Sequence, residues 1–381
     1  MPSRGTSERA EPEREAAHDA PARGQAGTVE RVIGFQRSIG NRRTAALVGG
    51  MQPRAISRYK ILGPWDIGEP VHETLTLLAV KQAKENLVAK GEDPGYLLWG
   101  FGTDVGVPDT SKPFNFDTIG AKEAQAQFLR GVVWADDPEG QLFDKPEDLS
   151  DYSSGWVWNQ RFEQGKAGDF DTLTARSHFG DLQFFHGMAS SDKEAPKTTK
   201  AHMLNWARFL VNVATGATFT FTKVKDVAEI SALFPKLGER TVKQLFGWGA
   251  GHFEDIRQRA IGALFHMIQD SFAEGHVQRN KKNEIVEFHA YGGQDEKKHA
   301  KHDALGGSGS ESLGERLKKT GGALSAIDAC ATVMEMIAEG KSTDEIVGHL
   351  DKTVFALASG VKPAGPGAGL GKPKPKAKAK P

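Results

Sequence analysis

The feature that most constrains the fold of this chain is an apolar helical pattern over residues 254–273 that carries ionisable side chains within it. Its apolar residues recur at helical spacing and predict a buried stripe: Ile256, Ala260, Ala263, Leu264, Met267 and Ile268. His266 and Asp270 are four residues apart, so their side chains project from one edge of that stripe. A lone pair of this kind is usually a hydrogen bond on a helix surface, so its meaning depends on the rest of the chain.

Further histidines and aspartates lie at predicted helix ends and at apolar junctions elsewhere. They are His72, Asp136, His178, His276, His299 and Asp303, and the last two are again four residues apart. Imidazole and carboxylate groups are the ligands that borderline cations such as zinc prefer, and an i, i+4 pair lets one helix supply two ligands to one ion. The set therefore predicts a metal site rather than ordinary core histidines.

The apolar periodicity predicts a mostly α-helical fold. Helices are expected at 71–90, 121–134, 197–214, 225–246, 254–273, 311–339 and 343–358, and the best strand pattern is A-T-F-T-F-T-K-V at 217–224. Long loops rich in glycine, aspartate and aromatic residues join these elements and are expected to carry function. The folded domain is expected to span residues 59–360.

Both ends of the chain have the composition of disordered segments. Residues 1–27 contain almost nothing apolar, and residues 361–381 contain six lysines, five prolines and no acid. Residues 28–58 are expected to form a short helical segment and a linker. Over the whole chain 49 basic residues balance 49 acidic ones, so the net charge indicates no class of partner.

The single cysteine, Cys330, excludes an intramolecular disulfide and is compatible with a reducing cytosol. It lies in the pattern A-I-D-A-C-A-T-V-M-E-M-I, where core packing is favoured over a role as nucleophile. No apolar run approaches the roughly 18 residues of a membrane helix, and residues 1–27 lack the apolar region of a signal peptide. The sequence therefore predicts a cytoplasmic protein without a Sec-type signal peptide or a transmembrane segment.

In their order along the chain, these histidines and aspartates resemble the ligand pattern of the zinc-dependent phospholipase C / S1–P1 nuclease superfamily. H-E-T-L-T-L-L-A, which starts at His72, and W-A-D, which ends at Asp136, are most similar to the nuclease branch. S-H-F-G-D, which contains His178, is more similar to the phospholipase branch. The resemblance covers residues 60–310 as separate motifs and implies a multi-helix phospholipase C/P1 nuclease-like domain.

The resemblance also implies three zinc ions and a role for each candidate residue. Asp136, His178, His266 and Asp270 would hold one ion, Asp270 would bridge to a second ion bound by His72, and the third would lie among His276, His299 and Asp303. The implied reaction is hydrolysis of a phosphoester by metal-activated water, without a covalent protein intermediate. The implied catalytic residues are Asp136 and Asp270.

The chain departs from the family pattern at the N-terminal ligand. In the family the mature chain starts at a tryptophan whose amino and carbonyl groups bind the ion shared with the first histidine, whereas Trp65 is internal here. Three explanations stay open: cleavage before Trp65, an oxygen ligand from Asp66 or Glu69, or a site with only two ions. Substitution or a two-ion site is favoured over cleavage, and Trp65 itself is expected to be a packing residue.

Other histidines compete for these roles. His289 and His302 are rivals of His299, which is favoured by its spacing to Asp303. His186 in L-Q-F-F-H-G-M either lines the cleft or is a core histidine, and the second interpretation is favoured. An insertion that contains T-F-T-F-T lies between His178 and His266 and leaves the substrate pocket undefined.

Residues 28–48 form a short amphipathic segment that resembles the L-Q-R-x-x-G-N-R-x-x-x-x-L pattern near the N-termini of toxins encoded with bacterial extracellular contractile injection systems. The matching residues are Phe35, Gln36, Arg37, Gly40, Asn41, Arg42 and Leu47. The resemblance implies a toxin or effector cargo that contacts the tube or baseplate of the injection particle. A linker helix of no particular meaning is the alternative.

Three functions are compatible with these patterns. The favoured one is a zinc-dependent phosphodiester hydrolase of the phospholipase C type. Its aromatic loops at 97–102 and 245–249 either contact phospholipid or serve ordinary loop packing. The alternative is a nuclease on single-stranded nucleic acid, for which the lysine-rich tail supplies phosphate attraction, although the tail suits anionic lipid equally. The third is a non-catalytic, metal-stabilised component of an injection particle, and the number of candidate ligands argues against it.

Overall fold

The computed structural model describes residues 71–93, 107–113, 123–140, 153–246 and 253–372. Several sequence interpretations concern residues outside these ranges. They are the segments 1–27 and 28–58, the alternative ligands Trp65, Asp66 and Glu69, the aromatic loop 97–102, most of the loop 245–249, and the lysine-rich end at 373–381.

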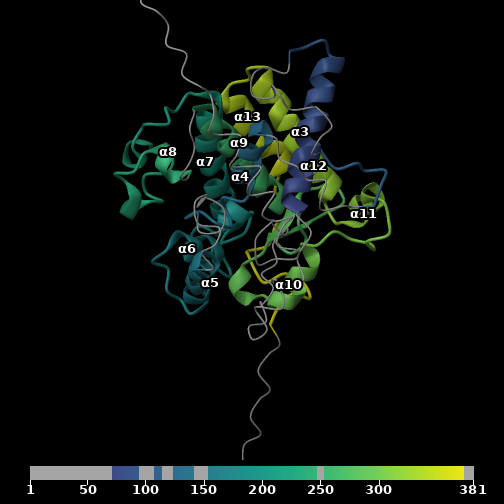
Figure 1. The fold of residues 1–381 in the computed structure, drawn as a ribbon. Coiled ribbons are helices and arrows are strands. Elements are labelled where there is room, and N and C mark those ends of the chain that lie inside the picture. Colours follow the sequence, from purple (N-terminus) through teal and green to yellow (C-terminus); the bar gives the residue numbers. More distant parts are fainter. Residues whose placement is uncertain (1–70, 94–106, 114–122, 141–152, 247–252, 373–381) are drawn as a thin grey trace, which may run out of the picture.

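The fold is built around one buried helix, α9 (Phe253–Asp270), as Figure 1 shows. From Ile256 onward nearly every side chain of α9 is buried, so the predicted apolar stripe belongs to a helix enclosed on all sides. Four helices pack around it: α3 (Val71–Ala89), α4 (Glu123–Val132), α7 (Pro196–Thr215) and α12 (Ala323–Ala338). The predicted mostly α-helical fold is confirmed for the described residues, and α3, α4, α7 and α9 lie where helices are expected.

Helices α4 and α9 approach each other closely because glycine occupies the contact on both sides. A Cβ atom on Gly262 of α9 would lie 2.2 Å from the carbonyl oxygen of Phe128, and one on Gly131 of α4 would lie 2.1 Å from that of Arg259. A side chain does not fit at such distances, so the crossing depends on the absence of a Cβ atom at both positions. The crossing places the loop that carries Asp136, just beyond α4, against the C-terminal half of α9.

Four short helices that the periodicity does not predict carry much of the candidate site. They are α5 (Ser153–Lys166), α6 (Leu173–Phe179), the 3₁₀ helix η3 (Gln183–His186) and α10 (Glu296–His302). Figure 1 shows α5, α6 and α10 toward the lower end of the view. Side chains start two of them: Thr172 accepts a hydrogen bond from the amide of Ala175 in α6, and Asp295 accepts from two amides of α10.

A β-hairpin follows α9. Its strands, β1 (Val277–Arg279) and β2 (Ile285–Phe288), pair antiparallel with Val277 opposite Phe288, and the 3₁₀ turn η6 (Tyr291–Gly293) follows. Two histidines flank the hairpin, His276 directly before β1 and His289 directly after β2. The amide of His289 donates a hydrogen bond to the carbonyl of His276 at 2.8 Å. The hairpin therefore fixes the chain on both sides of the segment that enters the candidate site.

Residues 361–372 lie along the hairpin and correct the expectation that a disordered tail starts at residue 361. The amide of Lys362 donates to the carbonyl of Val286 at 2.9 Å, and the amide of Ala290 donates to the carbonyl of Gly365 at 2.8 Å. Composition predicted disorder because residues 361–381 are rich in lysine and proline and contain no acid, but backbone hydrogen bonds do not depend on side chains. The described fold therefore extends to Lys372.

The strand predicted at 217–224 is wrong. The segment is a series of turns, in which the amide of Thr222 donates to the carbonyl of Phe219. Phe219 and Phe221 are 77% and 61% exposed whereas Thr220 between them is buried, so the alternation exposes the phenylalanines instead of placing them in the core.

The helix predicted at 225–246 is also wrong. The segment contains two short 3₁₀ turns, η4 (Val224–Asp226) and η5 (Pro235–Leu237), and one turn of α-helix, α8 (Val242–Leu245). Proline lacks the amide hydrogen that a continuous helix would need at position 235, and it occupies the first turn of η5 instead.

The two helices predicted near the C-terminal end are shorter than expected. Gly322, with φ +77°, separates α11 (Leu313–Lys319) from α12, and α13 (Thr343–His349) continues into a π turn, η7 (Leu350–Val354). Within the described ranges no single helix is long and apolar enough to cross a membrane. Helices α11 and α12 pass that test of length and composition only as a pair, and they are bent by 101° at their break.

The glycine crossing generates a testable prediction. Gly262→Ala should lower the free energy of unfolding by about 1–3 kcal/mol, because the new methyl group overpacks against α4. Gly348→Ala in α13 is the matched control: a Cβ atom there meets nothing within 4 Å, and alanine should stabilise the helix by up to about 1 kcal/mol. Urea unfolding measures both, and stabilisation by Gly262→Ala would show that the helices can separate without cost.

Candidate metal centre

The core of the candidate site is the end of α9, where His266 and Asp270 are both fully buried. Nε2 of His266 lies 3.0 Å from Oδ2 of Asp270, so the pair shares one side of the helix as the i, i+4 spacing predicts. Because both side chains are buried, the pair is not a hydrogen bond on the helix surface. An ionised carboxylate inside a protein needs compensation by a positive charge or by several hydrogen bonds.

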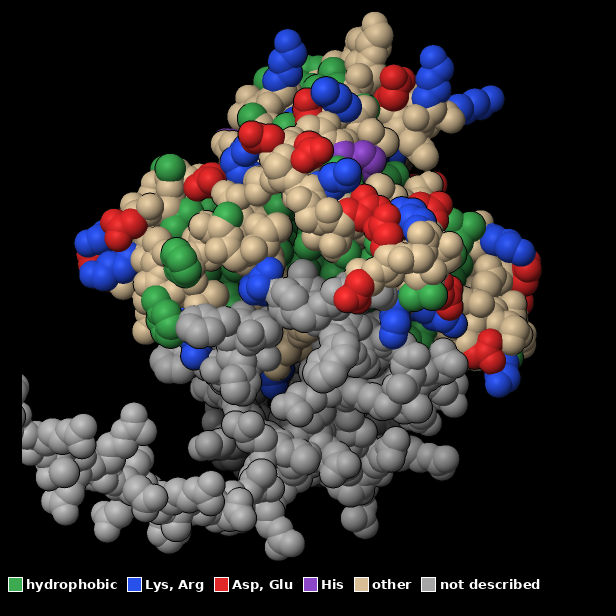
Figure 2. All heavy atoms as spheres, turned by 90° about the horizontal axis from the view of Figure 1, so that it is seen from above, with side chains coloured by type: hydrophobic (Ala, Val, Ile, Leu, Met, Phe, Trp, Pro, Cys, Tyr) green, Lys and Arg blue, Asp and Glu red, His purple; other side chains and the backbone are tan. Residues whose placement is uncertain are grey.

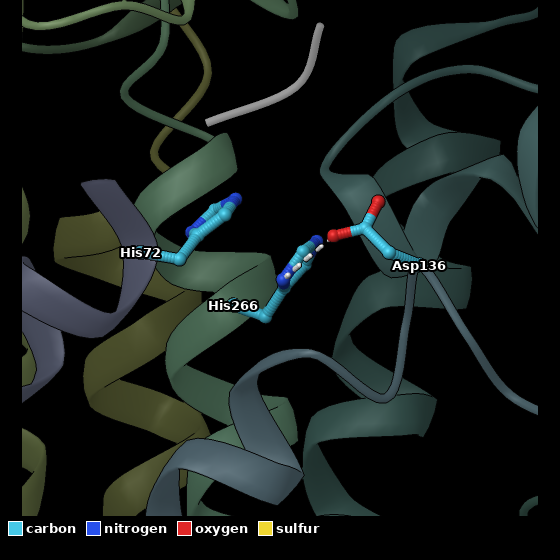
Figure 3. A group of neighbouring side chains, drawn as sticks. All are labelled: His72, Asp136 and His266. Atoms are coloured by element: carbon cyan, nitrogen blue, oxygen red, sulfur yellow. Dashed lines mark ion pairs between the residues drawn. The ribbon is translucent and has the colours of Figure 1, made fainter. Parts of the chain in front are cut away.

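Helix α3 brings a second imidazole to this carboxylate. Nε2 of His72 lies 3.3 Å from Oδ1 of Asp270, and the His72 ring stacks on that of His266 with their centroids 4.1 Å apart. Figure 3 shows His266 between His72 on one side and Asp136 on the other. Three segments distant in sequence therefore meet at one point.

Asp136 lies in the loop that follows α4 and faces three imidazoles. Its carboxylate oxygens lie 3.9 Å from Nε2 of His178, 3.9 Å from Nδ1 of His186 and 3.9 Å from Nδ1 of His266. The backbone carbonyl of Asp136 also accepts a hydrogen bond from the indole of Trp158 at 2.9 Å, which holds the loop in place. The side chain is 7% exposed.

His186 lies inside this cluster, although the sequence favoured a plain core histidine. Its Nδ1 lies 3.0 Å from Oδ2 of Asp270 and 2.8 Å from Nε2 of His266. It is fully buried, so the expected burial is right and the assumed isolation from the site is wrong. The apolar flanks in L-Q-F-F-H-G-M gave no signal that would separate the two interpretations.

A second group lies next to the first and contains His276, His299 and Asp303, all fully buried. Nε2 of His299 lies 3.0 Å from Oδ2 of Asp303, and Nε2 of His276 lies 3.6 Å from Oδ1 of the same residue. Nδ1 of His276 is 3.4 Å from Oδ2 of Asp270, so this histidine connects the two groups. A Cβ atom on Gly275 would lie 3.1 Å from both Asp303 and His299, so glycine keeps the space between them.

The two rivals of His299 lie elsewhere. Nδ1 of His302 is 3.1 Å from Oε2 of Glu274, and both side chains are substantially exposed. His289 is buried, but its Nδ1 donates to the carbonyl of Gly275 at 3.0 Å. All eight candidates chosen from the sequence therefore lie in the two groups, and the two rivals lie outside them.

Backbone carbonyls set the protonation of several of these imidazoles. Nδ1 of His266 lies 2.6 Å from the carbonyl oxygen of Val132, and Nδ1 of His178 lies 2.8 Å from that of Thr174. Nδ1 of His276 lies 2.8 Å from the carbonyl oxygen of His186. A carbonyl only accepts, so Nδ1 carries the proton in each case, and Nε2 of the neutral ring is an acceptor. This is the arrangement in which a second hydrogen bond orients a metal-binding histidine.

The histidines around Asp270 lower the pKa of its carboxyl group. Burial acts to raise the pKa of the Asp270 carboxyl, but the imidazoles of His276, His266 and His72 and the hydrogen bond from His186 outweigh burial and hold that pKa well below its usual range. Asp270 is therefore an anion near neutral pH, and the groups around it compete for one negative charge.

His72 shows the complementary shift. Burial acts to lower the pKa of this imidazole, but the charge of Asp270 and a hydrogen bond to it outweigh burial, so the pKa is raised. Near neutral pH either protons or a cation can therefore compensate the carboxylate.

The distances fit a cation well. Bonds of about 2.1 Å place the ligand atoms of one ion roughly 3.0–3.4 Å apart, close to the separations around Asp270. Four sets of three donors have all their ligand atoms within 4.8 Å: His72, Asp136, His266; Asp136, His178, His186; His186, His266, Asp270; and His276, His299, Asp303. Imidazole and carboxylate donors suit zinc and similar borderline cations. These buried groups could therefore hold metal ions.

No family model matches the chain, and comparison with curated proteins and with solved structures gives no match either.

Gln269 supports the site from outside and gives a second prediction. Its Oε1 lies 2.6 Å from Nδ1 of His72, and its Nε2 donates to Oγ1 of Thr76 at 2.9 Å, so it orients Nε2 of His72 toward Asp270. Gln269→Leu keeps the size and removes the acceptor. It should weaken metal affinity about 10–100-fold in competition with a chromophoric chelator.

Gln278→Leu is the control for that measurement, because residue 278 is an exposed position in β1. It should leave the affinity unchanged. Equal affinities for the two variants would show that the contact with His72 does not support metal binding.

Proposed function

We propose that this chain is a zinc-dependent phosphodiester hydrolase of the phospholipase C type. The observation that carries the proposal is the position of Asp270, which lies within 3.0–3.4 Å of nitrogen atoms from four histidines. A carboxylate that lies close to nitrogen atoms of four histidines is suited to bridge two metal ions. The resemblance of the ordered motifs to the phospholipase C / S1–P1 nuclease superfamily supplies the reaction class.

The number of donors favours catalysis over a purely structural ion. A structural zinc site is closed by four ligands, whereas two connected groups with Asp270 and Asp303 at their centres offer more donors than one such ion needs. When bound, zinc ions lower the pKa of water and neutralise the charge of a phosphate group. A non-catalytic component of an injection particle has no need for a second group.

The two acidic residues of the first group have different proposed roles. Asp270 is fully buried and anionic, so it holds the positive charge of the cluster in place. Asp136 is slightly exposed, and we assign to one of its oxygens the role of accepting a proton from the attacking water. Water adds to phosphorus, the ester P–O bond breaks, and the leaving oxygen takes up a proton.

The described surface favours phospholipid over nucleic acid as substrate. Figure 2 shows acidic and basic side chains interspersed on the face in view, without the basic stripe that follows a nucleic-acid backbone. Two exposed phenylalanines, Phe219 and Phe221, are of the type that contacts lipid at an interface. The nuclease alternative draws on W-A-D and on the lysines of residues 373–381.

The N-terminal segment gives the proposal a biological setting. Residues 28–48, with the resemblance to injection-associated toxins described above, would load the chain as cargo onto the tube or baseplate of a contractile particle. The hydrolase would then be made in the bacterial cytoplasm and act after delivery.

Hydrolysis assays test the proposed reaction. The zinc-loaded full-length chain should release phosphocholine from phosphatidylcholine vesicles, and Asp270→Asn should lower the rate at least about 10³-fold, because several kcal/mol of transition-state stabilisation are lost. Asp344→Asn, an exposed aspartate paired with Arg208, should retain the wild-type rate.

Single-stranded DNA serves as the competing substrate in the same assay. Cleavage of DNA with intact vesicles would favour the nuclease alternative. Activity toward neither substrate in a zinc-loaded chain would contradict a phosphodiester hydrolase of either kind.

A further inference from the structure

His186 lies where three donor atoms converge. Its Nδ1, Nε2 of His266 and Oδ2 of Asp270 form a triangle with sides of 2.8, 3.0 and 3.0 Å. Oδ1 of Asp136 lies 3.9 Å from Nδ1 of His186. All four side chains are at least 93% buried.

We propose that His186 is a metal ligand that completes a set with Asp136, His266 and Asp270, in the place that the sequence assigned to His178. The inference rests on the metal binding in the proposed function. It changes the composition of the first ion's coordination shell, and it replaces a residue of the sequence pattern with one that the pattern did not select.

Protons alone satisfy this triangle poorly. The Nδ1–H group of His266 donates to the carbonyl of Val132, so Nε2 of the neutral ring carries a lone pair. This lone pair lies next to Nδ1 of His186 and Oδ2 of Asp270. One proton joins two of the three atoms and leaves the third as a buried acceptor without its hydrogen bond. Two protons make His266 an imidazolium and place two N–H groups opposite each other with their nitrogen atoms 2.8 Å apart, and these groups repel each other in a buried site. A cation between the three atoms satisfies all of them.

His178 is less well placed for this role. Nε2 of His178 and Nδ1 of His186 both lie 3.9 Å from Oδ1 of Asp136, but Nδ1 of His186 also lies 3.0 Å from Oδ2 of the central Asp270. The His178 ring is held edge-on by Trp158 and Phe162, with ring centroids 5.5 and 5.1 Å away. These contacts suit a residue that packs behind Asp136 and orients its carboxylate.

The backbone around His186 is fixed on both sides of the site. Its carbonyl accepts a hydrogen bond from Nδ1 of His276 at 2.8 Å, which ties η3 to the second group. Gly187 adopts φ +63°, and a Cβ atom there would lie 3.0 Å from the backbone of Ser271, directly after α9. Close backbone contact therefore holds His186 next to Asp270, the residue with which it would bind the ion.

Cobalt(II) spectroscopy of His186→Cys in the full-length chain tests the proposal. A thiolate bound to cobalt gives a near-ultraviolet charge-transfer band that imidazole and carboxylate ligands do not give. The sulfur reaches slightly less far than Nδ1, and its longer bond of about 2.3 Å partly offsets the difference. The variant should bind as many cobalt ions as the wild type and show the new band.

Two controls isolate the signal. His289→Cys places a thiol at another buried histidine outside the donor groups and should show no band. The wild type controls for Cys330, a buried cysteine in α12 whose pKa is raised by burial. Wild-type cobalt stoichiometry in His186→Cys without the band would overturn the ligand role of His186. No cobalt in the wild type would instead overturn the proposed metal binding.

A second set of variants covers the case in which His186→Cys does not fold. His186→Asp keeps an oxygen near the position of Nδ1, and it should retain the ion with wild-type stoichiometry. His186→Leu should lower zinc affinity at least about 100-fold, and His178→Leu should lower it less. A larger loss for His178→Leu than for His186→Leu would return the ligand role to His178.

Discussion

The buried carboxylate of Asp270 is the constraint on which the rest of the structure depends. An ionised group without access to water costs several kcal/mol unless other charges compensate it, and removal of one partner of a buried pair typically costs about 3–5 kcal/mol. Four histidines supply that compensation, and they come from α3, α9, η3 and the turn before β1. The contacts between Asp270 and these histidines therefore both hold the elements together and form the candidate site.

The parts of the site that lie on one helix could be predicted from the sequence. The i, i+4 spacing alone places His266 beside Asp270, and helix α9 forms where the apolar periodicity predicts it. The pair His299 and Asp303 follows the same rule at the end of α10. Helical geometry is local, so spacing is sufficient evidence for contacts of this kind.

The remaining site residues could not be found by local rules. His72 lies 197 residues before Gln269, its hydrogen-bond partner, and only the ordered resemblance brought it into the candidate set. His186 was missed because its short 3₁₀ helix has no periodicity and its apolar neighbours are typical of any core. The strand predicted from T-F-T-F-T failed for the opposite reason, because a clear alternation occurs there in exposed turns.

Metal content tests the central claim most directly. Elemental mass spectrometry of the purified full-length chain should find two or three zinc ions per chain, and Asp270→Asn should lower that number because both groups contact its carboxylate. A chain that retains zero or one ion after incubation with zinc, or an Asp270→Asn variant with undiminished content, would contradict the account. In that case the buried histidines and aspartates would form a hydrogen-bonded polar core without a metal.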